Sequence, residues 1–156
     1  MFIGGNLNFS SVKDVSSNFG ISPVFGYWLN DKSAVVVKVG FNNHHTDLGD
    51  VTGSTIGFGA EYRYGWHLGD NLYTYLAPGV GYSIHDPNTD IDDNEDKSLD
   101  LGINGGLQYM IAPRWSINSR WGGLTYSSLT VGKADAVGSF SFSFFDNLNL
   151  GLNYHF

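Results

Sequence analysis

Residues 139–156, SFSFSFFDNLNLGLNYHF, form the stretch of this chain that decides its fold. Apolar or aromatic side chains occupy nearly every even position, and small or polar side chains occupy most odd positions. A period of two predicts a β-strand with one apolar face and one polar face. The stretch ends on Phe156, an exposed aromatic residue for which a water-soluble protein has little use. The pattern therefore predicts a strand that presents its apolar face to lipid.

The composition of the chain excludes several classes of protein. Its 156 residues suit a single domain, residues 1–156, and the absence of cysteine excludes disulfides and cysteine-based metal sites. The net charge of -7, with only eight Lys and Arg, argues against a nucleic-acid partner. No run of eighteen apolar residues is present, so no transmembrane helix is predicted. The 21 glycines fit a narrow barrel, in which large inward side chains would collide.

Eight alternating segments follow one another, and the connections between them are alternately long and short. The predicted strands are residues 2–10, 19–29, 33–43, 54–68, 72–84, 99–111, 115–127 and 139–156. This alternation of long and short connections is typical of a transmembrane barrel with short periplasmic turns and longer outer loops. Pro23 and Pro78 fall inside predicted strands. Because a closed barrel has no free edge for a residue without an N–H group, we expect a bulge or a strand end at each proline.

A soluble β-barrel or β-sandwich is the alternative fold, since those folds alternate as well. Their outward faces carry many charged residues, whereas charged residues make up only 15% of this chain. Aromatic residues also gather beside the short turns, at the level where Tyr and Trp prefer a membrane interface. This predicted girdle comprises Tyr27, Leu29, Tyr64, Trp66, Tyr109, Trp115, Tyr154 and Phe156. The sequence therefore predicts an all-β fold, an eight-stranded antiparallel up-and-down transmembrane β-barrel.

Five pieces of the chain resemble a known family. They are FIGGNLNFSS (2–11), FGISPVFGYWLNDKSAVVVKVGF (19–41), FGAEYRYGWHLGDNLYTYLAPGVGYSI (58–84), LDLGINGGLQYMIAPRWSINSRWGGLTYSS (99–128) and LNLGLNYHF (148–156). Each resembles the small eight-stranded outer-membrane β-barrel proteins ("porin family", OmpA/OmpX-like) of the Bacteroidetes type. The resemblance covers essentially the whole chain and implies the fold and the bacterial outer membrane, but it brings no catalytic or binding residues.

The same resemblance implies a role for the C-terminal residues. In such barrels the last strand and its terminal aromatic residue are the signal that the barrel-assembly machinery recognises, which here implies Leu152, Tyr154 and Phe156. At the other end, Met1 runs directly into a strand pattern, so a signal peptide is absent from this chain. We therefore expect a mature form of the protein.

Five charged residues lie on the predicted inward face: Lys38, Glu61, Arg63, Asp100 and Arg120. Counted from the short turns, the three cationic residues lie at similar depth, Glu61 lies two residues higher and Asp100 lies higher still. Eight strands leave an interior just wide enough to be filled by side chains. Because a buried charge is costly unless it is paired, we expect a charge-paired plug that holds the barrel shut. A narrow gated ion path is the alternative.

The longest polar loop is strongly acidic. Its acidic residues are Asp86, Asp90, Asp92, Asp93, Glu95 and Asp96. The density of oxygen ligands resembles a calcium loop, but Ile91 stands where an EF-hand needs glycine and Lys97 stands where it needs glutamate. We expect a solvated loop, with weak divalent-cation binding as the alternative. No other metal site and no cofactor are predicted.

A catalytic site is a further alternative, because some eight-stranded membrane barrels modify lipids with a Ser/His/acid set at the outer rim. His44, His85, Ser83, Ser127 and Asp47 supply the residue types for such a set. No spacing fixes their mutual distances, so the hypothesis depends on their availability alone.

The predicted function is therefore not enzymatic. We expect a barrel with a filled interior that serves as a structural or accessory subunit of an envelope complex. The alternatives are a lipid-modifying barrel enzyme of the outer leaflet and a small channel or carrier. The expected location is the bacterial outer membrane. The expected partners are outer-membrane lipid, lipopolysaccharide, the barrel-assembly machinery and a larger outer-membrane protein complex, with no nucleic acid.

Overall fold

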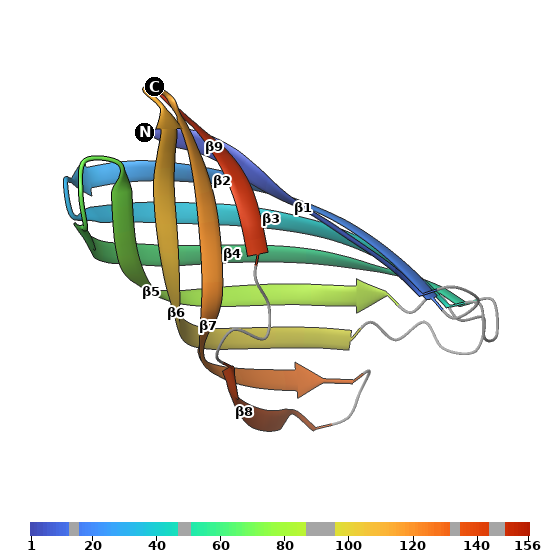
Figure 1. The fold of residues 1–156 in the computed structure, drawn as a ribbon. Coiled ribbons are helices and arrows are strands. Elements are labelled where there is room, and N and C mark those ends of the chain that lie inside the picture. Colours follow the sequence, from blue (N-terminus) through green and yellow to red (C-terminus); the bar gives the residue numbers. More distant parts are fainter. Residues whose placement is uncertain (13–15, 47–50, 87–95, 132–134, 144–148) are drawn as a thin grey trace.

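The computed structural model shows an antiparallel β-sheet that closes on itself (Figure 1). It describes residues 1–12, 16–46, 51–86, 96–131, 135–143 and 149–156. The strands are β1 (Phe2–Val12), β2 (Ser16–Asn30), β3 (Ser33–Thr46), β4 (Val51–His67), β5 (Leu72–Asp86), β6 (Asp96–Ala112), β7 (Trp115–Thr130), β8 (Val137–Ser143) and β9 (Asn149–His155). No helix in these ranges is long and apolar enough to cross a membrane.

The strands follow an up-and-down order. Each strand from β1 to β7 pairs antiparallel with the next, and β9 closes the barrel because it pairs with both β7 and β1. The eighth position in the wall is shared, since β8 pairs with the later part of β7 and β9 pairs with the earlier part. The prediction of a closed eight-stranded antiparallel barrel is confirmed.

The C-terminal stretch differs from the single strand that its alternation predicts. It forms β8 and β9, whose pairings with β7 follow different registers, and residues 144–148 between them lie outside the described ranges. The predicted apolar face nevertheless points outward in both pieces. Its exposed members are Phe140, Phe142, Leu150, Leu152 and Phe156. The period of two therefore identified the face correctly but did not reveal the change of register.

The two prolines leave the strands in register. Pro23 stays paired with Gly5 of β1, and Pro78 stays paired with Ile103 of β6. The pairing of β2 with β3 and that of β5 with β4 each skip two positions at the proline and then resume in the same register. The expectation of a bulge or a strand end was wrong, because the missing N–H group interrupts pairing with one neighbour only.

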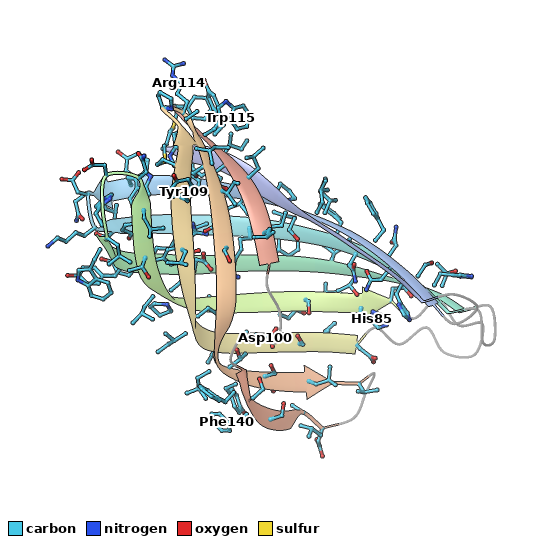
Figure 2. The ribbon with its side chains drawn as sticks, in the orientation of Figure 1. His85, Asp100, Tyr109, Arg114, Trp115 and Phe140 are labelled. Atoms are coloured by element: carbon cyan, nitrogen blue, oxygen red, sulfur yellow. The ribbon has the colours of Figure 1, made fainter. Side chains whose placement is uncertain are left out.

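The aromatic girdle lies at the end of the barrel where the two termini and the short turns meet (Figures 1 and 2). Tyr64 and Trp66 pack edge to face with ring centroids 5.5 Å apart, and Trp115 and Tyr154 do so at 5.1 Å. The other exposed members are Tyr27, Leu29, Tyr109 and Phe156. Exposed rings at one level suit the interface between lipid and water.

Apolar side chains also fill part of the interior, which the sequence analysis did not predict. Near the short turns, Phe2 is buried together with three aliphatic side chains, Val24, Ala34 and Val36. A second buried group, Tyr73, Tyr75 and Ala77, faces it, and Trp28 packs against both groups. The packed core of this barrel therefore sits in the half near the short turns.

Candidate functional site

The carboxylate of Glu61, on β4, is the point at which three cationic side chains meet. Lys38 Nζ donates a hydrogen bond to Glu61 Oε2 at 2.7 Å, and Arg63 Nε donates to Oε1 at 2.8 Å. Arg120 Nη2 donates to Oε2 from β7, so this ion pair passes across the barrel interior. The side chains of Glu61 and Arg63 are only 2% exposed. The cluster therefore ties three strands together inside the barrel.

Strand geometry explains how this cluster assembles. Glu61 and Arg63 are two residues apart on β4, so both side chains point inward. Lys38 on β3 is paired with Gly59. A Cβ atom at Gly59 would lie 3.4 Å from Lys38 Cε, so the lysine lies over a residue that has no side chain. The absence of that side chain lets Lys38 reach along the wall to Glu61.

Arg63 joins the ionic cluster to the aromatic core. Its guanidinium carbon lies 4.7 Å from the centre of the Tyr75 ring and 5.6 Å from the centre of the Phe2 ring. Tyr75 in turn donates a hydrogen bond to Asn118 Oδ1 on β7 at 2.7 Å. Contacts of a guanidinium with ring faces are favourable and strengthen when water is excluded. We call Lys38, Glu61, Arg63, Arg120 and the two rings the plug.

Asp100, the fifth of the predicted inward charges, lies apart from the plug. It accepts hydrogen bonds from Ser98 Oγ at 3.0 Å and from Ser127 Oγ at 2.5 Å. Ser83 extends this group through a 3.0 Å hydrogen bond with Ser98. Among the described residues, none of the three cations of the plug pairs with Asp100. The interior charges therefore form a group of four and a separate carboxylate.

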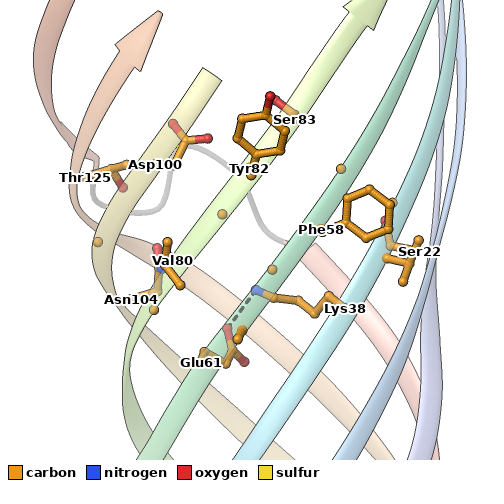
Figure 3. Close-up of a pocket in the computed structure, with 18 of the residues that line it drawn as sticks. Ser22, Lys38, Phe58, Glu61, Val80, Tyr82, Ser83, Asp100, Asn104 and Thr125 are labelled. Atoms are coloured by element: carbon orange, nitrogen blue, oxygen red, sulfur yellow. Dashed lines mark hydrogen bonds and ion pairs between the residues drawn. The ribbon is translucent and has the colours of Figure 1, made fainter. Parts of the chain in front are cut away.

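A cavity of about 320 Å³ lies on the long-loop side of the plug (Figure 3). Lys38 and Glu61 lie at one end of its lining, and Asp100 and Ser83 lie at the other. Arg120, which pairs with Glu61, also lines the cavity. Much of the wall between them is glycine, at positions 40, 57, 59, 79, 81 and 102. Among the described side chains, the plug fills one level of the barrel, and a cavity occupies part of the half beyond it.

A second cavity, of about 450 Å³, opens at the short-turn end. Aromatic and imidazole side chains line much of it, including Trp28, His67, Tyr73 and His155. The plug lies between the two cavities, because Tyr73 borders this one and stacks on Tyr75 with centroids 5.8 Å apart.

The residues proposed for a catalytic set have different partners in the structure. His85 Nδ1 lies 2.9 Å from Thr55 Oγ1, whereas Ser83 and Ser127 belong to the Asp100 group. His44 lies on β3, paired with Asn18 of β2 and Gly53 of β4, and Asp47 lies outside the described residues. Within the part of the chain that it describes, the structure therefore does not join these serines and His85 in a catalytic relay.

The acidic loop lies mostly outside the described residues, which include only its ends, Asp86 and Asp96. Within the described ranges, no group of three or more His, Asp or Glu residues is arranged to hold a metal ion. Divalent-cation binding by the loop stays a prediction.

The C-terminal residues of the predicted assembly signal form a small aromatic group on the outer face. The Tyr154 ring packs edge to face against Phe156 with centroids 5.1 Å apart, and Leu152 and Phe156 are exposed. Arg114, in the neighbouring turn, donates a hydrogen bond to Tyr154 Oη at 3.1 Å, and this bond raises the pKa of the exposed guanidinium. The signalling role of these residues stays a prediction.

Comparison with known proteins agrees with this architecture. The model of a family described as "Outer membrane protein beta-barrel domain" matches residues 1–156. The chain belongs to this outer-membrane β-barrel family. No curated protein matches the chain significantly. Assignment to the Bacteroidetes type within the family stays a prediction.

Solved structures of small outer-membrane proteins share the fold. The Neisserial surface protein NspA is 18% identical, with a TM-score of 0.60 over 99% of this chain and 94% of that one. A major outer membrane protein from Thermus thermophilus is 15% identical, with a TM-score of 0.58 over 99% and 98% of the two chains. The N-terminal barrel of Pseudomonas aeruginosa OprF is also 15% identical, with a TM-score of 0.53 over 99% and 95%. At these identities the similarity concerns the fold alone.

Proposed function

We propose that this member of the family is a non-enzymatic structural barrel of the bacterial outer membrane, held shut by its plug. The observation that carries the proposal is the Glu61 carboxylate, both oxygens of which are occupied by cations from β3, β4 and β7. The bond from Arg120 crosses the interior, and Arg63 is held between two rings. Such cross-ties resist deformation of the wall and place charged side chains between the two cavities.

The energetics of the cluster support a structural role over conduction. Breaking a buried ion pair by removing one partner costs about 3–5 kcal/mol, because a buried charge is left uncompensated. An ion path that displaced one of the three cations from Glu61 would carry this cost. A barrel whose task is to stay closed gains stability from the same contacts.

The outer surface suits an element embedded in the envelope. Its exposed apolar strand faces and aromatic girdle fit outer-membrane lipid and lipopolysaccharide. We propose that the barrel-assembly machinery recognises this chain by its C-terminal residues. We also include a larger outer-membrane complex, to which a barrel without its own chemistry would contribute as an accessory subunit.

Reconstitution tests this proposal directly. The refolded protein in planar bilayers is expected to give no conductance steps, and vesicles that contain it are expected to release no fatty acid from phospholipid or lipid A. Folding of each preparation is verified by faster migration on SDS gels before boiling than after, since a closed barrel resists detergent. Steady conductance would support a channel instead, and lipid turnover would support an enzyme.

A cellular experiment tests the structural role itself. Deleting the gene is expected to raise the sensitivity of cells to detergent and to large antibiotics, and the intact protein is expected to restore resistance. Glu61→Gln, which weakens the plug, should restore it less well than Asp70→Asn, which changes an exposed turn residue. Equal sensitivity with and without the protein would contradict a contribution to envelope integrity.

A further inference from the structure

We propose that the glycine-lined cavity on the long-loop side of the plug binds a small zwitterion. Its anionic group, a phosphate or carboxylate, contacts Lys38 and Arg120, and its ammonium group contacts Asp100. This inference goes beyond the structural role, because a closed barrel needs no ligand to hold its shape. It depends on three observations: the arrangement of opposite charges, the excess of positive charge at one end, and the empty space between them.

Strand register places the opposite charges at the two ends of one row. Lys38 pairs with Gly59, Gly59 pairs with Gly81, and Gly81 pairs with Asp100, so the row crosses four neighbouring strands. Both charged side chains lean over the glycines. A Cβ atom at Gly59 would lie 3.4 Å from Lys38 Cε, and one at Gly81 would lie 3.8 Å from Asp100 Oδ2. The two charged residues therefore lie at opposite ends of a row whose two middle residues are glycines, and Figure 3 shows both in the lining of the cavity.

The distance between the two charges suits a small molecule. Cβ positions that are directly opposite on paired strands lie about 4.5–5.5 Å apart. Lys38 Cε and Asp100 Oδ2 are therefore within roughly 13 Å of each other, and the two side chains form no ion pair among the described residues. A short zwitterion with a hydrogen bond at each end can span a separation of this size. The cavity volume of about 320 Å³ accommodates a molecule of that size but not a diacyl lipid.

Among the described residues, the basic end of the cavity carries more positive charge than its ion pairs neutralise. Lys38, Arg63 and Arg120 share the single carboxylate of Glu61, which leaves an excess of two positive charges among these four side chains. The side chains of Lys38 and Arg120 are 25% and 27% exposed, and both line the cavity. Buried excess charge of one sign is costly, so an anion that contacts these two side chains would relieve it.

Spare donors at this end make the contact specific. A lysine ammonium has three N–H donors and a guanidinium has five. Within the described residues, Lys38 Nζ and Arg120 Nη2 each donate a hydrogen bond to Glu61, which uses only part of the donors of the two groups. At the other end, each Asp100 oxygen accepts one hydrogen bond from a serine, and a carboxylate oxygen has a second lone pair that an ammonium group can use. The two ends therefore complement opposite ends of one ligand.

Titration calorimetry on the refolded protein in detergent tests the inference. The probes are phosphorylethanolamine and γ-aminobutyrate as zwitterions, inorganic phosphate as the anion alone, and ethanolamine as the cation alone. The zwitterions are expected to bind more tightly than either single ion. Because phosphorylethanolamine occurs both as a free molecule and as a lipid headgroup, a short-chain phosphatidylethanolamine is tested in parallel. Tighter binding of soluble phosphorylethanolamine than of the lipid identifies a free ligand, as the cavity volume requires, and the reverse order would overturn that assignment.

Two variants separate the ends of the site. Lys38→Gln is expected to weaken both phosphate and phosphorylethanolamine by about tenfold, because it removes a charge-assisted contact. Asp100→Asn is expected to weaken phosphorylethanolamine by a similar factor while leaving phosphate binding equal or tighter. The matched controls are Lys32→Gln and Asp70→Asn, which change exposed turn residues and are expected to leave all four probes unaffected. Unboiled gel mobility verifies that each variant is folded.

The outcome pattern decides the proposal. No binding of any zwitterion by the folded protein at millimolar concentration overturns it, as does equal weakening of phosphate and phosphorylethanolamine by Asp100→Asn. Weaker binding of both probes by Lys38→Gln, together with weaker binding of phosphorylethanolamine alone by Asp100→Asn, supports it. The result is independent of the proposed structural role, since conductance and envelope integrity are measured without ligand.

Discussion

Glycine has different roles in the two halves of this barrel. In the half near the short turns, glycine makes room for rings: a Cβ atom at Gly26 would overlap the Phe2 ring, and one at Gly106 would overlap the Tyr75 ring. In the long-loop half, a Cβ atom at Gly57 or Gly81 would meet its nearest neighbour at 3.7 Å, an ordinary contact. Glycine therefore permits tight packing at Gly26 and Gly106, whereas at Gly57 and Gly81 it leaves space empty.

The difference shows where the stability of the barrel resides. The packed half holds the buried aromatic and aliphatic side chains and the four-membered charge cluster. The long-loop half holds the Asp100 carboxylate with its serine partners and a cavity of about 320 Å³. Substitutions in the packed half should therefore destabilise the fold, whereas comparable changes in the long-loop half should affect what it binds.

The largest expected effect is that of Glu61→Gln. The substitution removes the only carboxylate that the structure places among Lys38, Arg63 and Arg120 in the described part of the chain. Because three cations then lack a counter-charge, we expect a loss of about 3–5 kcal/mol in the free energy of unfolding. Urea unfolding in detergent, followed by gel mobility, measures it. Asp70→Asn is the control, and equal stability of the two variants would show that the plug does not hold the barrel together.

Gly26→Ala is expected to have the next largest effect. The added methyl group would overlap the Phe2 ring, which is fully buried, so the ring and its neighbours must shift. Overpacking of this kind costs about 1–3 kcal/mol. The same urea titration measures the loss. Near-normal stability would mean that the packed half tolerates rearrangement and is less tightly organised than the close approach of Phe2 implies.

Deleting Phe156 should have a modest effect on the folded barrel and a large one in cells. Its side chain is 68% exposed on the outer face, so losing it should cost about 1–2 kcal/mol through lost burial in the interface. If the residue also belongs to the assembly signal, the yield in the outer membrane falls far more than the refolding yield in detergent. Parallel measurement of both yields, for the full chain and for the chain that ends at His155, decides the point. Small and equal losses would reduce Phe156 to an interface anchor.

The smallest effect is expected for Gly57→Ala, the counterpart of Gly26→Ala in the long-loop half. The added methyl group would make ordinary contacts with Ser83 Cβ and with a backbone oxygen, so stability should stay within about 0.5 kcal/mol of the original. The urea midpoint provides the measurement. A loss as large as that of Gly26→Ala would indicate that the cavity wall is packed, and the contrast between the two halves would be lost.

Much of the fold was predictable because strand alternation is a local property. The period of two identified which residues face outward, from Val35 and Val37 on β3 to Leu150 and Leu152 on β9. The turn residues and the alternating loop lengths predicted the strand number and the up-and-down order. The prolines could not be judged in this way, because the cost of a missing N–H group depends on which neighbour the group would face.

The interior shows what alternation leaves undetermined. The sequence by itself determined that Lys38, Glu61, Arg63, Asp100 and Arg120 point inward, since inward and outward positions alternate along each strand. Only the tertiary structure decided that Glu61 gathers the three cations and that Asp100 lies apart with Ser98 and Ser127. The physical reason is that the stagger between strands and the length of the side chains determine which residues meet across a barrel interior. Neither quantity can be read from the alternation along a single strand.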